Sequence, residues 1–282
     1  MIRQIRVPQG FVEMSDEGVG DDAVLLLHGF TGSKESWLDL RRALAPRRRV
    51  IAIDLPGHGG TEVGADPADH SMERVAEMIE RVLQALAIEH IAIIGYSMGG
   101  RLALYFTLSR PQRVCRLVLE SASAGLADSA ERAERAAADE ALAALVESAG
   151  IEAFVAKWQA LPLFQSLADL REEARERLRR QRLACSPAGL AASLRGMGTG
   201  VQPWLGDRLE EIGIPVLLIT GGRDTKFTRI GSELRRAISG ARLEIVAEAG
   251  HIPHLEGPKE FNHIVSEFLQ EDSHAGSVAN GS

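Results

Sequence analysis

The 282-residue sequence is poor in cysteine, has no excess of basic residues and contains no long apolar run. Its two cysteines, Cys115 and Cys185, are too few and too far apart for a disulfide framework. Lysine and arginine number 32 against 39 acidic residues, and the net charge of −7 argues against nucleic-acid binding by overall charge. We therefore expect no nucleic-acid partner, and we expect Cys115 to pack as a small hydrophobic side chain in an apolar strand.

The apolar runs are far shorter than the roughly 20 residues of a membrane-spanning helix. The polar segment that follows Met1 also lacks the apolar region of a signal peptide. The sequence therefore predicts a cytoplasmic protein with no membrane insertion. It does not indicate an oligomeric state.

Strand and helix patterns alternate from residue 23 to 121, which is typical of βαβ units and a parallel sheet. The expected strands cover residues 23–27, 50–53, 91–94, 114–119, 214–219 and 243–246. The expected helices include residues 37–45, 71–86, 229–238 and 258–269. Residues 1–20 are expected to form an opening strand or hairpin.

The alternation stops between residues 122 and 201, where alanine, arginine and glutamate dominate. Because the strand pattern resumes afterwards, we interpret 122–201 as a helical cap inserted into one core. The core would then comprise residues 1–121 and 202–270. Residues 271–282 are polar and small, and we expect them to form a disordered tail.

One stretch carries chemistry by itself, the motif Gly95-Tyr96-Ser97-Met98-Gly99 between an apolar strand and a helix. This G-x-S-x-G pattern is the nucleophile elbow, a tight turn that presents a serine hydroxyl at the carboxyl edge of a sheet. A tight turn with an incidental serine is the alternative interpretation. The positions of possible partner residues favour the elbow.

Asp224 and His251 each follow a predicted strand, and with Ser97 they occur in the order of the α/β-hydrolase triad. Imidazole titrates near neutrality and can take the serine proton, while an aspartate orients the ring. The sequence thus predicts the catalytic set Ser97, His251 and Asp224. The rivals for base and acid that the sequence leaves open are His28, His58, His254 and Asp54.

In this class of fold, an oxyanion hole is formed by two backbone N–H groups. One comes from the loop after the strand 23–27, where we expect Phe30, and the other from Met98, directly after the serine. Arg101 lies one helical turn beyond Ser97, and a cation there must be solvated, paired or matched to an anionic ligand. The cap offers further arginines in Arg132, Arg135 and Arg182.

Taken together, these segments resemble the menaquinone-pathway family of 2-succinyl-6-hydroxy-2,4-cyclohexadiene-1-carboxylate synthases, the MenH family of the α/β-hydrolase superfamily. The resemblance spans roughly residues 23–269 and is most specific in the elbow arginine and the cap. The motifs that carry it are residues 27–32, 54–59, 95–101, 130–135, 158–159, 162–164, 221–227 and 249–251.

The resemblance implies an α/β-hydrolase fold, a mostly parallel central sheet flanked by helices with an inserted helical cap. It implies a lyase that expels pyruvate from a small tricarboxylate substrate, without a cofactor and without a metal. Ser97, assisted by His251, would abstract the proton α to a ketone. Arg101, Arg135 and Arg182 would bind carboxylates, and Tyr96 and Trp158 would line the pocket.

Two other classes of function remain open from the sequence. A carboxylesterase, thioesterase or C–C bond hydrolase acting on an acidic substrate would use the same triad through attack of Ser97 on a carbonyl. A small-molecule receptor built on a retained hydrolase pocket has only the fold in its favour, and fold alone is weak evidence for function.

Overall fold

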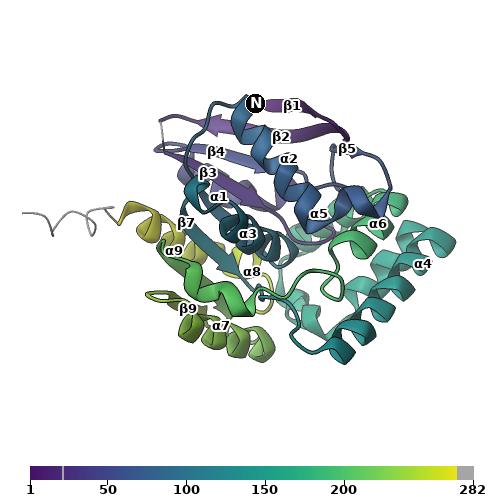
Figure 1. Cartoon of the computed structure of the whole chain (residues 1–282). Coiled ribbons are helices and arrows are strands. Elements are labelled where there is room, and N and C mark those ends of the chain that lie inside the picture. The colour runs from purple at the N-terminus through teal and green to yellow at the C-terminus, as the bar shows by residue number, and fades with distance from the viewer. Residues whose placement is uncertain (21, 272–282) are drawn as a thin grey trace, which may run out of the picture.

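The computed structural model describes residues 1–20 and 22–271, which form a nine-stranded mixed sheet with helices on both faces (Figure 1). The strand order is β1-β2-β4-β3-β6-β7-β8-β9, with β5 paired to β2. Strands β1 and β2 form an antiparallel hairpin, and β2 pairs antiparallel with β4. The pairings from β4 through β9 are parallel, which confirms the predicted α/β-hydrolase-like core.

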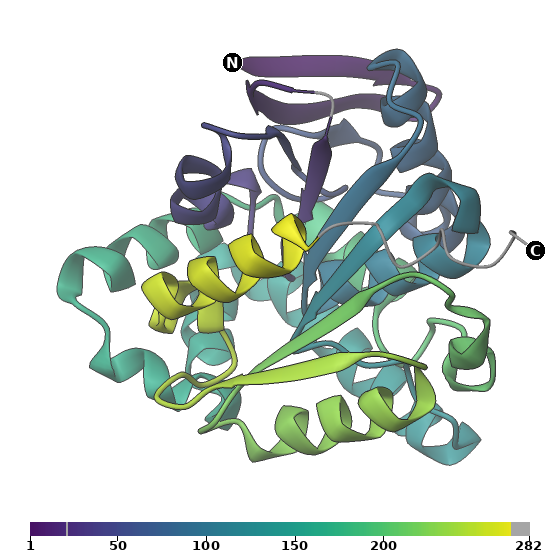
Figure 2. The same cartoon turned by 90° about the vertical axis from the view of Figure 1, so that its left-hand side faces the viewer.

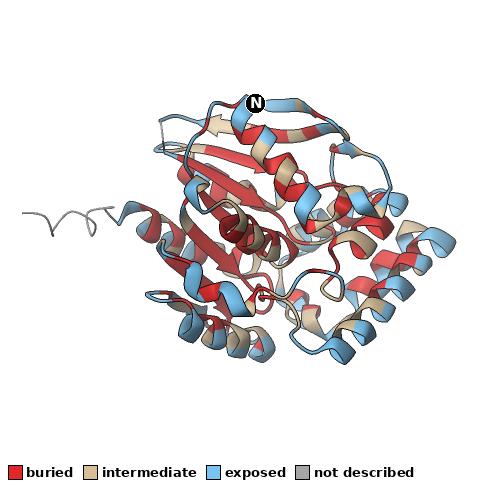
Figure 3. Ribbon diagram, in the orientation of Figure 1, coloured by how far each residue is buried: buried red, intermediate tan, exposed pale blue. Residues whose placement is uncertain are grey.

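The bounds of the strands follow the predicted apolar runs closely. The strands are β1 (Ile2–Val7), β2 (Gly10–Gly18), β3 (Ala23–Leu27), β4 (Arg49–Ile53), β5 (Glu62–Val63), β6 (Ile91–Tyr96), β7 (Val114–Glu120), β8 (Val216–Gly221) and β9 (Arg242–Val246). Every residue of β3, β6 and β8 is buried, as expected for strands covered on both faces. Figure 3 shows the sheet as the buried centre of the molecule.

Helices cover the sheet on two sides, and each side has its own apolar cluster. One cluster joins the sheet to α2, α3 and α7, and the other joins it to α1 and α9. Figure 2 shows α7 and α9 on opposite sides of β8 and β9. The α-helices of the core are α1 (Leu38–Leu44), α2 (Met72–Ala85), α3 (Met98–Ser109), α7 (Thr225–Ala237), α8 (Pro253–Glu256) and α9 (Pro258–Gln270). The short 3₁₀ helices are η1 (Lys34–Trp37), η2 (Pro67–His70), η3 (Pro111–Arg113), η4 (Pro162–Asp169) and η5 (Gly206–Glu211).

Two local predictions were wrong. Helix α7 begins at Thr225, four residues earlier than expected, because the Asp224 side chain accepts a hydrogen bond from the Phe227 N–H and caps the helix. Cys115 is exposed, because successive side chains of a strand point to opposite faces and its neighbour Val114 is the buried one. The thiol therefore does not pack as a core side chain.

The helices α4 (Ser129–Gln159), α5 (Glu172–Leu183) and α6 (Pro187–Met197) lie between β7 and β8 in the chain. Figure 1 shows α4 and α6 gathered at one end of the sheet. Helix α4 is interrupted at Gly150, whose φ of 82° is favourable only for glycine. This is the segment predicted as a cap, and the division of the chain at residues 122 and 201 stays a prediction. We keep the name cap for residues 122–201.

Of the predicted tail 271–282, Glu271 follows the last helix and residues 272–282 lie outside the described residues. Within residues 1–20 and 22–271, the structure contains no helix with the length and apolar character needed to cross a membrane.

Candidate active site

The elbow places Ser97 at the junction of β6 and α3 in a strained conformation. Its φ of 50° and ψ of −109° lie outside the regions that a non-glycine residue normally adopts. A Cβ atom on Gly95 would lie 2.4 Å from the Gly99 carbonyl oxygen, and one on Gly99 would lie 2.2 Å from the Leu27 carbonyl oxygen. Glycine is therefore required at both positions, because the turn brings backbone against backbone.

The structure brings Ser97, His251 and Asp224 into one hydrogen-bonded line. The distance from Ser97 Oγ to His251 Nε2 is 3.2 Å, and that from His251 Nδ1 to Asp224 Oδ2 is 2.7 Å. Because a carboxylate only accepts hydrogen bonds, Nδ1 donates to Asp224 and Nε2 is left as the acceptor for the serine hydroxyl. This arrangement gives Ser97 a base at hydrogen-bond distance.

Two backbone contacts hold the loop that carries His251. The carboxylate of Glu256 accepts the N–H of Gly250 at 2.8 Å and the N–H of Ile252 at 2.9 Å. The residues on either side of His251 are thus tied to one side chain. The sequence did not single out Glu256, because its role depends on how the loop folds back over α8.

Phe30 and Met98 both line the cavity above Ser97, as the prediction of an oxyanion hole requires. Met98 is the first residue of α3, so its N–H has no partner within the helix. The N–H at a helix start favours negative charge. The Met98 N–H is therefore available to a ligand oxygen near Ser97, and the role of the Phe30 N–H stays a prediction.

The three other histidines that the sequence offered as the base form hydrogen bonds away from Ser97. His28 Nε2 accepts the Leu55 N–H at 2.9 Å, and His58 Nε2 accepts the Thr31 N–H at 3.1 Å. Burial lowers the pKa of both rings, that of His58 to about 3. His254 is bound to the buried carboxylate of Glu120, with Nδ1 2.8 Å from Oε2. None of these three histidines lines the cavity.

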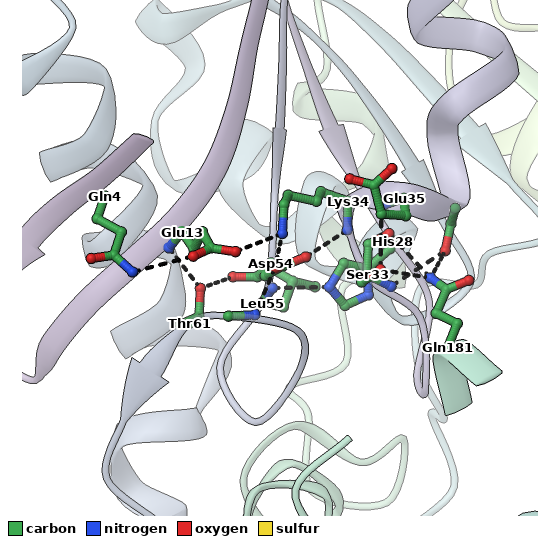
Figure 4. A network of polar contacts seen from close by, with 12 residues as sticks. Gln4, Glu13, His28, Ser33, Lys34, Glu35, Asp54, Leu55, Thr61 and Gln181 are labelled. Atoms are coloured by element: carbon green, nitrogen blue, oxygen red, sulfur yellow. Dashed lines mark hydrogen bonds and ion pairs between the residues drawn. The ribbon is translucent and has the colours of Figure 1, made fainter. Parts of the chain in front are cut away.

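The rival acid, Asp54, belongs to a supporting network (Figure 4). Its carboxylate accepts the Lys34 ammonium at 2.7 Å, the Lys34 N–H at 2.6 Å and the Gly60 N–H at 2.8 Å. On the cap side, the Gln181 amide donates to the hydroxyls of Ser33 and Ser36 at 2.9 and 2.5 Å. The network therefore braces the loop of Phe30 and ties it to α5.

A cavity of about 890 Å³ lies over Ser97, between the strand ends and the cap. Its apolar wall includes Tyr96, Trp158 and Phe164. The indole of Trp158 packs edge-to-face against Phe30, with ring centroids 5.1 Å apart, and the Tyr96 ring lies 5.5 Å from that of His251. Both predicted pocket residues are thus in the wall.

Arg101 and Arg135 bring positive charge to this cavity. Arg101 is half-buried and donates from Nη1 to the Met197 carbonyl at 2.9 Å and to the Gln202 amide oxygen. Burial and the nearby Arg135 lower the pKa of Arg101 to about 10. Within the described residues Arg101 has no carboxylate partner, which leaves an anionic ligand as a favourable counter-charge.

The comparison with known proteins agrees with this geometry. Residues 22–258 match the family described as alpha/beta hydrolase fold. A Bacillus subtilis (strain 168) protein, provisionally named 2-succinyl-6-hydroxy-2,4-cyclohexadiene-1-carboxylate synthase, is 47% identical over 257 residues, which cover 91% of this chain and 93% of that protein. The synthase of the same name from Serratia proteamaculans (strain 568) is 30% identical, with 87% and 92% covered. The structure of MenH from S. aureus has a TM-score of 0.88 and 34% identity, with 92% and 98% covered.

The chain belongs to the 2-succinyl-6-hydroxy-2,4-cyclohexadiene-1-carboxylate synthase family. This confirms the resemblance that the motifs indicated. The family name specifies a carboxylate product. The positions of the cap arginines therefore bear on how such an anion could be bound.

The third predicted arginine does not reach the cavity of this family member. Arg182 is buried behind Phe164, with its guanidinium 4.9 Å from the ring centroid, and it lines an adjoining cavity of about 40 Å³. Tyr96 and Phe164 form part of the wall of both cavities. Arg132 donates to the carbonyls of Leu126 and Ala127 and lines neither cavity. Helical spacing alone could not distinguish these directions.

Sequence reasoning assigned no role to several charged residues of the cavity region. Arg223 and Asp169 line the cavity as an exposed ion pair. Lys226, an exposed side chain, lines the cavity and forms no ion pair with the described residues. Asp139 is buried behind Arg135 and accepts its Nε–H at 2.9 Å. The motif around Asp224 contains Lys226, so spacing could have drawn attention to it. Asp139 carries no such signal.

The site offers no obvious place for a metal ion. Among residues 1–20 and 22–271, no group of three or more histidine, cysteine, aspartate or glutamate side chains stands close enough together to hold one. The residues that line the cavity include Ser97 with its base, Met98 at the start of α3, several cations and one exposed carboxylate, that of Asp169. Such a set can remove a proton from an anionic ligand and stabilise the negative charge that forms.

Proposed function

We propose that this chain is a 2-succinyl-6-hydroxy-2,4-cyclohexadiene-1-carboxylate synthase, which eliminates pyruvate from 2-succinyl-5-enolpyruvyl-6-hydroxy-3-cyclohexene-1-carboxylate. The observation that carries the proposal is the base-activated Ser97 facing Arg101 and Arg135 in one cavity. The substrate is a small tricarboxylate, and the reaction uses no cofactor or metal. As part of the proposal, the enzyme works in the cytoplasm and has no nucleic-acid partner.

In the proposed reaction, His251 Nε2 takes the Ser97 hydroxyl proton as Oγ removes the ring proton α to the succinyl ketone. The N–H groups of Phe30 and Met98 stabilise the resulting enolate oxygen. Its electrons return through the ring, the ring double bond shifts, and the C–O bond to the enolpyruvyl group breaks. The departing enolate takes up a proton and becomes pyruvate, so no acyl-enzyme forms.

Charge sets the orientation of the substrate in this scheme. Arg101 and Arg135 each hold a carboxylate, since a guanidinium offers paired donors that match a carboxylate. Lys226 and the ion-paired Arg223 are further cations in the wall. Arg182 adds positive charge from behind Phe164 and Tyr96. Tyr96 and Trp158 close the apolar sides of the pocket.

The test supplies the enolpyruvyl intermediate to the purified enzyme and measures pyruvate with a coupled lactate dehydrogenase assay. We expect one pyruvate per substrate consumed. Ser97→Ala should lower kcat by roughly 10²- to 10⁴-fold, the usual contribution of a positioned base. Ser109→Ala, at the far end of the same helix, is the matched control and should keep full activity.

Pyruvate no higher than in the enzyme-free reaction would contradict the proposal. The hydrolase alternative makes a different prediction, because in it Ser97 attacks a carbonyl and an acyl-enzyme or a gem-diol forms. A burst of product from an activated neutral ester, together with no pyruvate release, would favour that alternative.

A further inference from the structure

One buried carboxylate that the proposed mechanism does not use, that of Asp139, lies behind the cavity wall, where it is bound to the wall residue Arg135. It lies on α4 one turn after Arg135, and its side chain is only 4% exposed. Oδ1 accepts the Arg135 Nε–H at 2.9 Å, whereas Oδ2 is buried and binds no other side chain among the described residues. The backbone of Gly200 also stabilises the charged carboxylate.

The contact uses one end of the Arg135 guanidinium and leaves the other end open. Nε is bound to Asp139, while Nη1 and Nη2 form no hydrogen bond to any described residue. The Arg135 side chain is 40% exposed and lines the cavity over Ser97. Because the guanidinium is planar, a bond at Nε fixes the plane in which Nη1 and Nη2 lie.

The charge of Asp139 also reaches Arg101. The pKa of Arg101 is lowered by burial and by Arg135, and Asp139 opposes that shift. Burial in turn raises the pKa of Asp139 against the pull of both arginines. The three side chains therefore form one electrostatic group, in which the positive charges of Arg101 and Arg135 line the cavity and the negative charge of Asp139 lies behind them.

We propose that Asp139 is a positioning residue that aims Arg135 at a substrate carboxylate, and that its negative charge limits how tightly the cavity holds anionic ligands. The inference rests on the proposed function for the identity of the substrate. The first effect raises affinity, because Arg135 loses less rotational freedom on binding. The second lowers affinity by repulsion, which favours release of the acidic product.

These two effects can be separated by two substitutions. Asp139→Asn keeps an acceptor oxygen for the Arg135 Nε–H but removes the charge, so KM for the enolpyruvyl substrate should fall about 3- to 10-fold through loss of repulsion. Asp139→Ala removes both, so its KM should exceed that of the Asn variant by about 10-fold or more as Arg135 loses its alignment. In an Arg135→Ala background, the difference between the Asn and Ala variants should disappear.

The matched control is Glu140→Gln, one residue further along α4. Its carboxylate is exposed and pairs with Arg195 away from the cavity. This variant should keep the wild-type KM. Since Asn is nearly isosteric with Asp, the Asn variant keeps the inference testable even where the Ala variant folds poorly.

Binding of citrate, a tricarboxylate probe, is measured by calorimetry on the same variants, so that the inference is tested without turnover. We expect the Asn variant to bind citrate more tightly than the wild type, and the Ala variant more weakly than the Asn variant. Equal citrate affinity and equal KM in wild type and both variants would overturn the inference, as would equal losses in both. Absence of pyruvate release from the wild type would overturn the proposed function instead, while the order of citrate affinities would still test Asp139.

Discussion

Arginine is the residue type whose position separates this site from that of a general hydrolase. Arg101 is half-buried in the cavity wall and bonded only to uncharged oxygens, those of Met197 and Gln202, among the described residues. Burying a cation without a carboxylate costs free energy, and the lowered pKa of about 10 reflects that cost. A substrate carboxylate paired with Arg101 would offset this desolvation free energy. The unpaired guanidinium of the free enzyme therefore favours binding of an anionic ligand.

Replacing Arg101 tests whether its guanidinium binds a substrate carboxylate. We expect Arg101→Ala to lower kcat/KM by a factor equivalent to about 2–5 kcal/mol, the usual loss when a buried charge partner is removed. Arg101→Lys should recover only part, since an ammonium does not offer the paired donors of a guanidinium. Steady-state kinetics of pyruvate release measures both variants. Arg195→Ala, which removes an exposed cap arginine paired with Glu140 and Glu147, is the control, and equal losses in Arg101→Ala and Arg195→Ala would count against the idea.

At the scale of secondary structure, the position of Ser97 is fixed by the unit that β6, the elbow and α3 form. The strand ends at Tyr96 and the helix begins at Met98, so the whole change of direction falls on Ser97. The Ser97 N–H donates to the Glu120 carbonyl of β7 at 2.8 Å, which anchors the turn to the next strand. Close packing of the glycines on the backbone of β3 and its following loop then fixes the elbow relative to Phe30.

A methyl group at Gly99 should disturb this packing. Its Cβ would lie 2.2 Å from the Leu27 oxygen and 2.5 Å from that of His28, both backbone atoms that cannot rotate away. We expect Gly99→Ala to lower stability by about 1–3 kcal/mol, as overpacking does, and Tm by about 2–10 °C. Thermal unfolding followed by circular dichroism gives the Tm. Gly213→Ala, with no heavy atom within 4 Å of the new methyl, is the control, and an unchanged Tm for Gly99→Ala would refute the clash.

At the scale of the whole molecule, buried neutral histidines link folding to pH. Burial lowers the pKa of His28, His58 and His70, that of His58 from 6.5 to about 3. Between pH 6.5 and about 3 the unfolded chain therefore binds a proton at His58 and the folded protein does not, and the corresponding windows of His28 and His70 also begin at pH 6.5. Stability is present above pH 6.5 and is lost as the pH falls through this window.

We expect the free energy of unfolding to fall below pH 6.5 by up to about 1.4 kcal/mol per pH unit for each such histidine. Urea unfolding at several pH values between 7 and 5 measures the slope. Carboxylates titrate in part of the same window, so the comparison is with His58→Asn, whose side chain does not titrate. Its slope should be shallower, and parallel curves for the two proteins would rule out His58 as a source.

Much of the site could be predicted from the sequence because its information is local or follows from topology. A tight turn between strand and helix has a short signature, so Ser97 was identifiable. Asp224 follows β8 and His251 follows β9, and parallel strands bring their carboxyl ends to one edge. The same reasoning located Phe30 and Met98, since their position depends only on the strand that precedes each.

The directions of the cap side chains were decided only by the tertiary structure. Helical spacing says which residues share a face, but the packing of α4, α5 and α6 decides where that face points. Arg135 thus faces the cavity, Arg182 lies behind Phe164, and Arg132 bonds to backbone carbonyls. The tertiary structure also decided the ion pair of Arg135 with Asp139 and the hydrogen bonds of Glu256 and Gln181. Each of these contacts joins groups whose distance depends on how whole helices and loops pack.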